Sequence, residues 1–145
     1  MKVLWIEDQE PARDMLTIAS DKAACARVQL DLVLAGTLIE AESRLRLERF
    51  DMVVTDLTLP DSYDGDMTIA RLANMGNHRI AVSSAHPERD QIVATALRCG
   101  CNIAPEPIAK AGLPYNRFIQ RPEAMLDFLI SMMEAAKPDP RIAAA

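Results

Sequence analysis

Short apolar runs alternate along this chain with segments in which apolar residues recur at helical spacing. The runs cover residues 2–6, 28–34, 52–55 and 79–84. Such brief runs are typical of strands buried on both faces, and connecting helices join strands that run parallel. The pattern therefore predicts the α/β class: a doubly wound, five-stranded parallel sheet with helices on both faces.

The second half of the chain is harder to interpret because prolines and a glycine interrupt any period over residues 101–116. We expect this segment to be an irregular or briefly helical insertion between the fourth helix (about 87–100) and the fifth strand. We place that strand at 117–120 and the last helix after Pro122. Residues 1–136 then form one domain, and 137–145 form a flexible tail.

Composition narrows the functional classes. A chain of 145 residues can bury a core without disulfides, and Cys25, Cys99 and Cys101 contain no CxxC pair that would indicate a zinc site. The net charge of −5 argues against a nucleic-acid partner. No stretch resembles a signal peptide or a membrane span, so we expect a cytoplasmic protein with no membrane contact.

Oxygen-bearing side chains follow three of the predicted strands. Glu7 and Asp8 come after the first strand, Asp56 after the third, and Ser84 ends the fourth. The carboxyl ends of parallel strands form the ligand-binding edge of such a sheet, and gathered carboxylates favour a hard cation such as Mg²⁺. Asp56 is placed to act as a nucleophile toward a phosphorylated donor, with the Ser84 hydroxyl as a hydrogen-bond donor.

These motifs resemble those of response-regulator receiver domains from two-component signalling. "VLWIEDQE" is similar to their first strand with its acidic pair, "GTLIEAESRLRLERFDMVVTDLTLPDSYDG" to the stretch from the second helix to the phosphoacceptor loop, and "IAVSSA" to the fourth strand. The resemblance implies that Asp56 is the phosphoacceptor and Ser84 the switch hydroxyl. It also implies a Mg²⁺ site formed by Glu7, Asp8, Asp56 and the backbone carbonyl of Thr58.

The chain departs from the family where a Lys-Pro pair normally ends the fifth strand. Glu106-Pro107 has nearly the expected distance from Ser84, Arg121-Pro122 lies later, and Lys110 could reach the site from the insertion. We expect Arg121, because 117–120 is a credible strand and a convincing helix follows. A guanidinium keeps lysine's charge but not its compact geometry. The loop between Pro60 and Gly65 is also longer than usual.

The resemblance implies a stand-alone receiver that accepts a phosphoryl group from a histidine kinase or phosphotransfer protein and signals to a downstream protein. The chain could also be a fragment of a longer protein. The alternative is a phosphorylation-independent pseudo-receiver that acts as a protein-interaction module, which the missing Lys-Pro favours. A phosphatase using Asp56 is a weaker alternative, because Thr58 stands where a second catalytic aspartate would be needed.

The last helix carries more apolar surface than one sheet can cover. Its apolar side chains spread over about 200° of the helix, against the ~100° stripe that packing on one sheet requires. They are Met125, Leu126, Phe128, Leu129, Ile130, Met132 and Met133. We expect the surplus to contact a second copy or a partner helix; the alternative is that the insertion covers it internally.

Overall fold

A computed structural model of the chain describes residues 1–62 and 64–136. Parallel strands form one five-stranded sheet in the order β2-β1-β3-β4-β5. They are β1 (Lys2–Ile6), β2 (Asp31–Ala35), β3 (Met52–Thr55), β4 (Ile80–Ser84) and β5 (Ile108–Ala109). The predicted α/β class is confirmed. The predicted tail at 137–145 lies outside the described residues.

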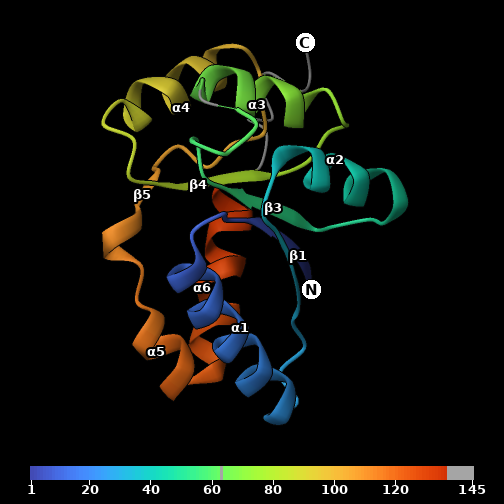
Figure 1. Ribbon diagram of the computed structural model, residues 1–145, viewed down its shortest axis with the longest axis vertical. Helices are drawn as coiled ribbons and strands as arrows, with labels where there is room; N and C mark the ends of the chain where they lie inside the picture. Colours follow the sequence, from blue (N-terminus) through green and yellow to red (C-terminus); the bar gives the residue numbers. More distant parts are fainter. Residues whose placement is uncertain (63, 137–145) are drawn as a thin grey trace.

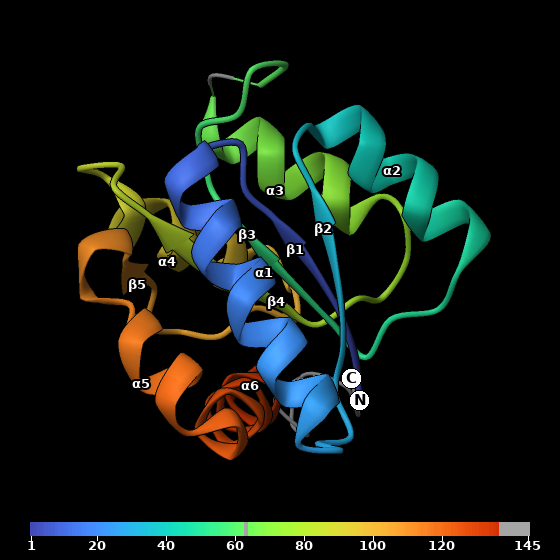
Figure 2. The ribbon, with the colours of Figure 1, turned by 60° about the horizontal axis from the view of Figure 1, so that its bottom comes forward.

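Helices cover both faces of the sheet. They are α1 (Glu10–Cys25), α2 (Leu38–Leu47), α3 (Gly65–Ala73), α4 (Arg89–Arg98), α5 (Tyr115–Gln120) and α6 (Pro122–Ala135). In Figure 1, α2, α3 and α4 lie above the sheet and α1, α5 and α6 below it. Figure 2 shows α1 running across the sheet with α5 and α6 beside its far end. Within the part of the chain that the structure describes, no helix is both long and apolar enough to cross a membrane.

Alternate side chains of the central strands point to opposite faces of the sheet and pack into two hydrophobic cores. From β1, Leu4 and Ile6 pack with α2, α3 and α4, whereas Val3 and Trp5 pack with α1, α5 and α6. All four side chains are at most 1% exposed. Burial on both faces explains why these strands are continuous apolar runs without polar alternation.

The parallel register brings the strand ends together at one edge. Ile6 of β1 is level with Thr55 of β3, and Thr55 is level with Val82 of β4. The residues that follow these strands therefore emerge next to one another. This edge carries the acidic residues singled out in the sequence.

The fifth strand is not where the sequence analysis placed it. Residues 117–120 lie in α5, and β5 is the two-residue segment Ile108–Ala109, paired with Ser83 and Ser84. Four residues with two adjacent apolar side chains satisfy a helix as well as a strand. Here the helix is favoured because it turns Phe118 inward, where it is 1% exposed and its ring lies 5.3 Å from that of Phe128.

The strand that we expected after the 101–116 segment therefore lies inside it. The rest of this segment contains an isolated bridge between Ile103 and Ile80 and a short 3₁₀ turn, Lys110–Gly112. The short α5 that follows joins β5 to the last helix.

The apolar surface of α6 is largely used inside the molecule. Met125 and Leu129 are fully buried, and Phe128, Met132 and Met133 are partly buried against the same core. Helices α1 and α5 both contact α6. Much of the apolar surface of α6 that the sheet does not cover is therefore buried within the chain. This was the alternative to a contact with a second copy or a partner helix.

Candidate functional site

Three carboxylates meet at the carboxyl edge of the sheet. Glu7 and Asp8 follow β1 and Asp56 follows β3, and each offers an oxygen within 4.8 Å of the others. Glu7 is 2% exposed and Asp56 is 6% exposed. The structure thus brings together the acidic residues that the sequence singled out, in a largely buried cluster.

The Asp56 carboxylate is held in one orientation. Its Oδ1 accepts hydrogen bonds from the Ser84 hydroxyl at 2.7 Å and from the backbone N–H groups of Leu57 and Thr58 at 2.7 and 3.2 Å. Ser84 is fully buried, and its Oγ accepts from the His86 backbone N–H at 3.0 Å. These contacts fix Oδ1 and leave Oδ2 directed toward a cation.

That cation is Lys110, which directly follows β5. Its Nζ donates to Oδ2 of Asp56 at 3.0 Å and forms an ion pair with Oε1 of Glu7. Pairing of β5 with the end of β4 delivers this ammonium to the site. Lys110 therefore lies where a positive charge can contact both buried carboxylates.

The preference for Arg121 as this cation is wrong. Arg121 lies between α5 and α6 rather than at a strand end. Glu106 is exposed and precedes β5 by one proline. Lys110, which the sequence left open as a third choice, was hard to favour because a two-residue strand between Pro107 and a 3₁₀ turn carries almost no periodic signal.

Burial and charge act in opposition on these groups. Burial raises the pKa of Glu7 above its ordinary value, with the negative charge of Asp56 adding to the effect and the Lys110 contacts only partly offsetting it. Burial lowers the pKa of Lys110, but its hydrogen bonds to Glu7 and Asp56 outweigh that effect and leave the pKa raised. Lys110 is therefore an ammonium at neutral pH.

The remaining donors fit a divalent cation. Oδ1 of Asp8 is buried and has no hydrogen-bond partner among the described residues. Three carboxylates against one ammonium leave an excess of negative charge, and hard cations such as Mg²⁺ take oxygen ligands. A cleft of about 560 Å³ opens beside the cluster, and Asp8, Asp56 and Thr58 are among the residues that line it. The cluster is thus consistent with divalent metal binding.

The loop after Asp56 is attached to α2. Asp61 accepts hydrogen bonds from the backbone N–H groups of Leu38 and Ile39, both at 2.8 Å, and Thr37 caps the same helix end by accepting from Glu40. Burial by itself raises the pKa of Asp61, but these backbone hydrogen bonds outweigh it, so the pKa lies below its ordinary value. The helix end thereby anchors the loop that carries Thr58.

No family model matches the chain, and no curated protein matches it in sequence. Solved structures do match in fold. The non-phosphorylated HemR receiver domain from Leptospira biflexa is 22% identical with a TM-score of 0.62, covering 95% of each chain. The phosphorylated cyanobacterial phytochrome response regulator RcpA is 21% identical with a TM-score of 0.63, covering 90% of this chain and 94% of that one.

The Mn²⁺-bound form of response regulator Rcp1 is 16% identical with a TM-score of 0.60, covering 86% of this chain and 93% of that one. RcpA and Rcp1 are response regulators, and the HemR structure is of a receiver domain. The fold of this chain is that of a receiver domain.

Proposed function

We propose that the chain is a response-regulator receiver that accepts a phosphoryl group on Asp56 from a histidine kinase or phosphotransfer protein, with Mg²⁺ as cofactor. The arrangement around Asp56 carries this proposal: Ser84 holds one carboxylate oxygen and Lys110 contacts the other. A buried nucleophile with a cation and a hydroxyl donor beside it suits phosphoryl transfer, in which positioning and charge stabilisation supply most of the catalysis.

Each residue has a defined part in this reaction. An Asp56 oxygen forms the new P–O bond while the P–N bond to the donor histidine breaks. Lys110 and the Ser84 hydroxyl then donate to the phosphoryl oxygens, and Glu7 holds the ammonium in place through its ion pair. Bound Mg²⁺, held by Asp8, Asp56 and the Thr58 carbonyl, would offset the charge on those oxygens.

The alternative of a pseudo-receiver loses its main support. It depended on the absence of a lysine at the end of the fifth strand, yet the Lys110 ammonium lies 3.0 Å from Asp56. The neighbours RcpA, described as phosphorylated, and Rcp1, described as Mn²⁺-bound, support phosphorylation and metal binding in this fold. We further propose that the protein acts in the cytoplasm and passes its signal to a downstream protein by direct contact.

Incubation with Mg²⁺ and acetyl phosphate, followed by intact mass spectrometry, tests the proposal. We expect one acid-labile phosphoryl group on the wild type and none on Asp56→Asn. Asp14→Asn, an exposed change on α1 that also removes one carboxylate, is the matched control and should react normally. An unmodified wild type beside a conventional receiver that reacts would leave the phosphorylation-independent module as the function.

A further inference from the structure

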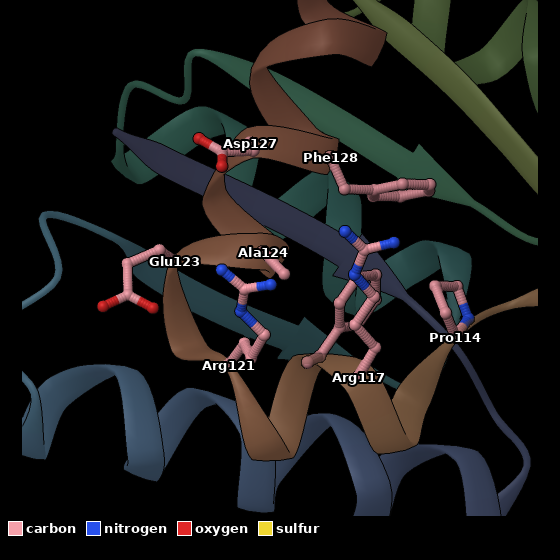
Figure 3. A pocket seen from close by; sticks show the side chains of 8 residues that line it. Pro114, Arg117, Arg121, Glu123, Ala124, Asp127 and Phe128 are labelled. Atoms are coloured by element: carbon pink, nitrogen blue, oxygen red, sulfur yellow. The ribbon is translucent and has the colours of Figure 1, made fainter.

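A second cleft, of about 340 Å³, lies between α5 and α6. Its charged lining residues are Arg117, Arg121, Glu123 and Asp127, and Phe118 and Phe128 are among the others. In Figure 3 the side chains of Arg117 and Arg121 rise from the α5 side, with Ala124 between their ends in this view, while the side chains of Glu123 and Asp127 extend from α6. The Asp56 cleft shares none of these residues.

Each side of the cleft carries two like charges at helical spacing. The backbone N–H of Arg121 donates to the Arg117 carbonyl at 2.8 Å, which keeps the two arginines one turn apart. Glu123 and Asp127 are also one turn apart, on α6. Like charges four residues apart on a helix destabilise it by a few tenths of a kcal/mol, roughly. The helix dipole favours Arg117 in the last turn of α5 and Glu123 in the first turn of α6. It does not account for Asp127 or for Arg121, which lies between the two helices. Helix stability therefore does not explain all four charges.

The two pairs do not neutralise each other within the chain. The ion pairs among residues 1–62 and 64–136 involve Lys2, Arg44, Arg71 and Lys110 as cations, so neither cleft arginine belongs to one. All four charged residues of the cleft are exposed. They are free to contact another molecule.

The balance of charge indicates what that molecule presents. Two arginines and two acids sum to no net charge, so the cleft does not select a simple anion or a simple cation. Its complement is a surface with acids opposite the arginines and arginines opposite the acids. A second copy related by a two-fold axis has this pattern. In such an interface the arginines of each copy can face the acids of the other copy.

One aromatic side chain of the cleft supports a protein partner. Phe118 is 1% exposed and so already covered within the chain, whereas Phe128, whose ring centroid lies 5.3 Å from that of Phe118, is half-buried and keeps apolar surface in the cleft. An apolar centre inside a charged rim is the usual anatomy of a protein interface, in which arginine and phenylalanine are enriched. Exposed ion pairs alone contribute about 0–1 kcal/mol each, so the contact also needs to cover the exposed part of Phe128.

We propose that the α5–α6 cleft is the interface of a two-fold symmetric dimer. In it, Arg117 and Arg121 of one copy face Glu123 and Asp127 of the second copy, and the half-buried Phe128 side chains cover each other. The proposal does not depend on phosphorylation of Asp56. Because several of its contacts are exposed charges, the dimer weakens as salt concentration rises.

Charge reversal tests this directly, with molar mass measured by sedimentation equilibrium over a concentration series. Arg117→Glu with Arg121→Glu makes the cleft wholly acidic, and Glu123→Arg with Asp127→Arg makes it wholly basic. We expect dimer formation by the wild type, monomers for each double variant alone, and a heterodimer when the two are mixed. The variant with all four changes should dimerise again.

A matched control makes the same change in net charge elsewhere. Arg46 and Arg49 are exposed residues at and just beyond the end of α2, and reversing both to Glu should leave the dimer intact. Circular dichroism verifies that each variant is folded. A wild type that stays monomeric throughout, a dimer that both double variants retain, or a mixture that does not associate would each overturn the proposal.

Discussion

The Nζ atom of Lys110 lies 3.0 Å from Oδ2 of Asp56, although β5 supplies only two residues to the sheet. The same ammonium pairs with Glu7, so one positive charge offsets the negative charges of two buried carboxylates. A divalent cation bound at the cluster would offset the same negative charges.

Replacement of Lys110 by Met should therefore have two effects in opposite directions. Without metal, Glu7 and Asp56 lose their partner, and breaking a fully buried pair costs about 3–5 kcal/mol. Since Lys110 is partly exposed, we expect a smaller loss, about 1–3 kcal/mol by chemical denaturation. Mg²⁺ should bind more tightly by calorimetry, because the competing positive charge is gone.

Lys2→Met is the control for this change. Lys2 also forms an ion pair, with Glu48, but at a more exposed position away from the cluster. Its replacement should cost about 0–1 kcal/mol and leave Mg²⁺ affinity unchanged. Equal Mg²⁺ affinity in Lys110→Met and the wild type would show that the Lys110 ammonium does not compete with Mg²⁺ for the carboxylates.

Asp61 should contribute stability that depends on pH. Its pKa is lowered in the folded state, so the folded protein holds fewer protons than the unfolded chain as the pH falls. The contribution is present above the unfolded pKa, about 3.9, and is lost as the pH falls through the folded pKa. Asp61→Asn removes the charge and one of two acceptor oxygens, and should cost about 1 kcal/mol at pH 7.

Denaturant melts of the wild type and Asp61→Asn across this pH range provide the measurement. The difference in unfolding free energy should shrink toward zero in acid. Asp66→Asn, an exposed change in the first turn of α3, controls for the loss of an acidic residue near the loop. A difference that stays constant with pH would show that the hydrogen bonds of Asp61 do not depend on its charge.

Phe118→Ala should be among the most damaging single changes in the second half of the chain. Phe118 is 1% exposed and is the buried residue of α5. Truncation of such a core phenylalanine costs about 3–5 kcal/mol because it leaves a cavity as well as losing apolar contact. Phe118→Leu should cost less, and Phe50→Ala, at a half-buried position, is the comparison. A thermal melt of Phe118→Ala that matches the wild type would refute the packing role of α5.

The absence of a side chain at Gly65, in the first turn of α3, lets Ile92 of α4 pack closely against this position. A Cβ atom at this position would lie 2.7 Å from Cδ1 of Ile92 and 3.3 Å from Cβ of Leu57. We expect Gly65→Ala to destabilise the fold by about 1–3 kcal/mol through overpacking. Ile92→Val removes the clashing methyl, so Gly65→Ala should cost less in that background, measured as a double-mutant cycle.

Gly112→Ala is the matched substitution, because a Cβ there meets nothing within 4 Å. Its effect should be near zero or slightly stabilising. Additive effects of Gly65→Ala and Ile92→Val would show that the two positions are not in contact.

The sequence allowed most of the fold to be predicted because strands buried on both faces leave clear apolar runs. Glu7, Asp8, Asp56 and Ser84 were found in the same way, since each is at or just after the end of such a run. Their closeness follows from the parallel register alone.

The sequence named Lys110 only as the third of three candidates, because the strand that precedes it has no pattern of its own. Ile108 and Ala109 are placed by pairing with Ser83 and Ser84, a tertiary contact that local periodicity does not report. The attachment of Asp61 to α2 was missed for a similar reason, since 22 residues or more separate the hydrogen-bonded groups. The positions of Lys110 and Asp61 therefore depend on contacts between residues far apart in the sequence, which local patterns do not reveal.

The shortness of β5 also bears on motion. Edge strands with few ladder hydrogen bonds open locally at a small free-energy cost, well below that of global unfolding. Lys110 is joined to such a strand, whereas Asp56 follows the fully buried central strand β3. We therefore expect the ammonium to leave the carboxylates and return by a local opening while the rest of the sheet stays folded. On this expectation, the positive charge beside Asp56 varies with local fluctuation of β5 and does not require the domain to unfold.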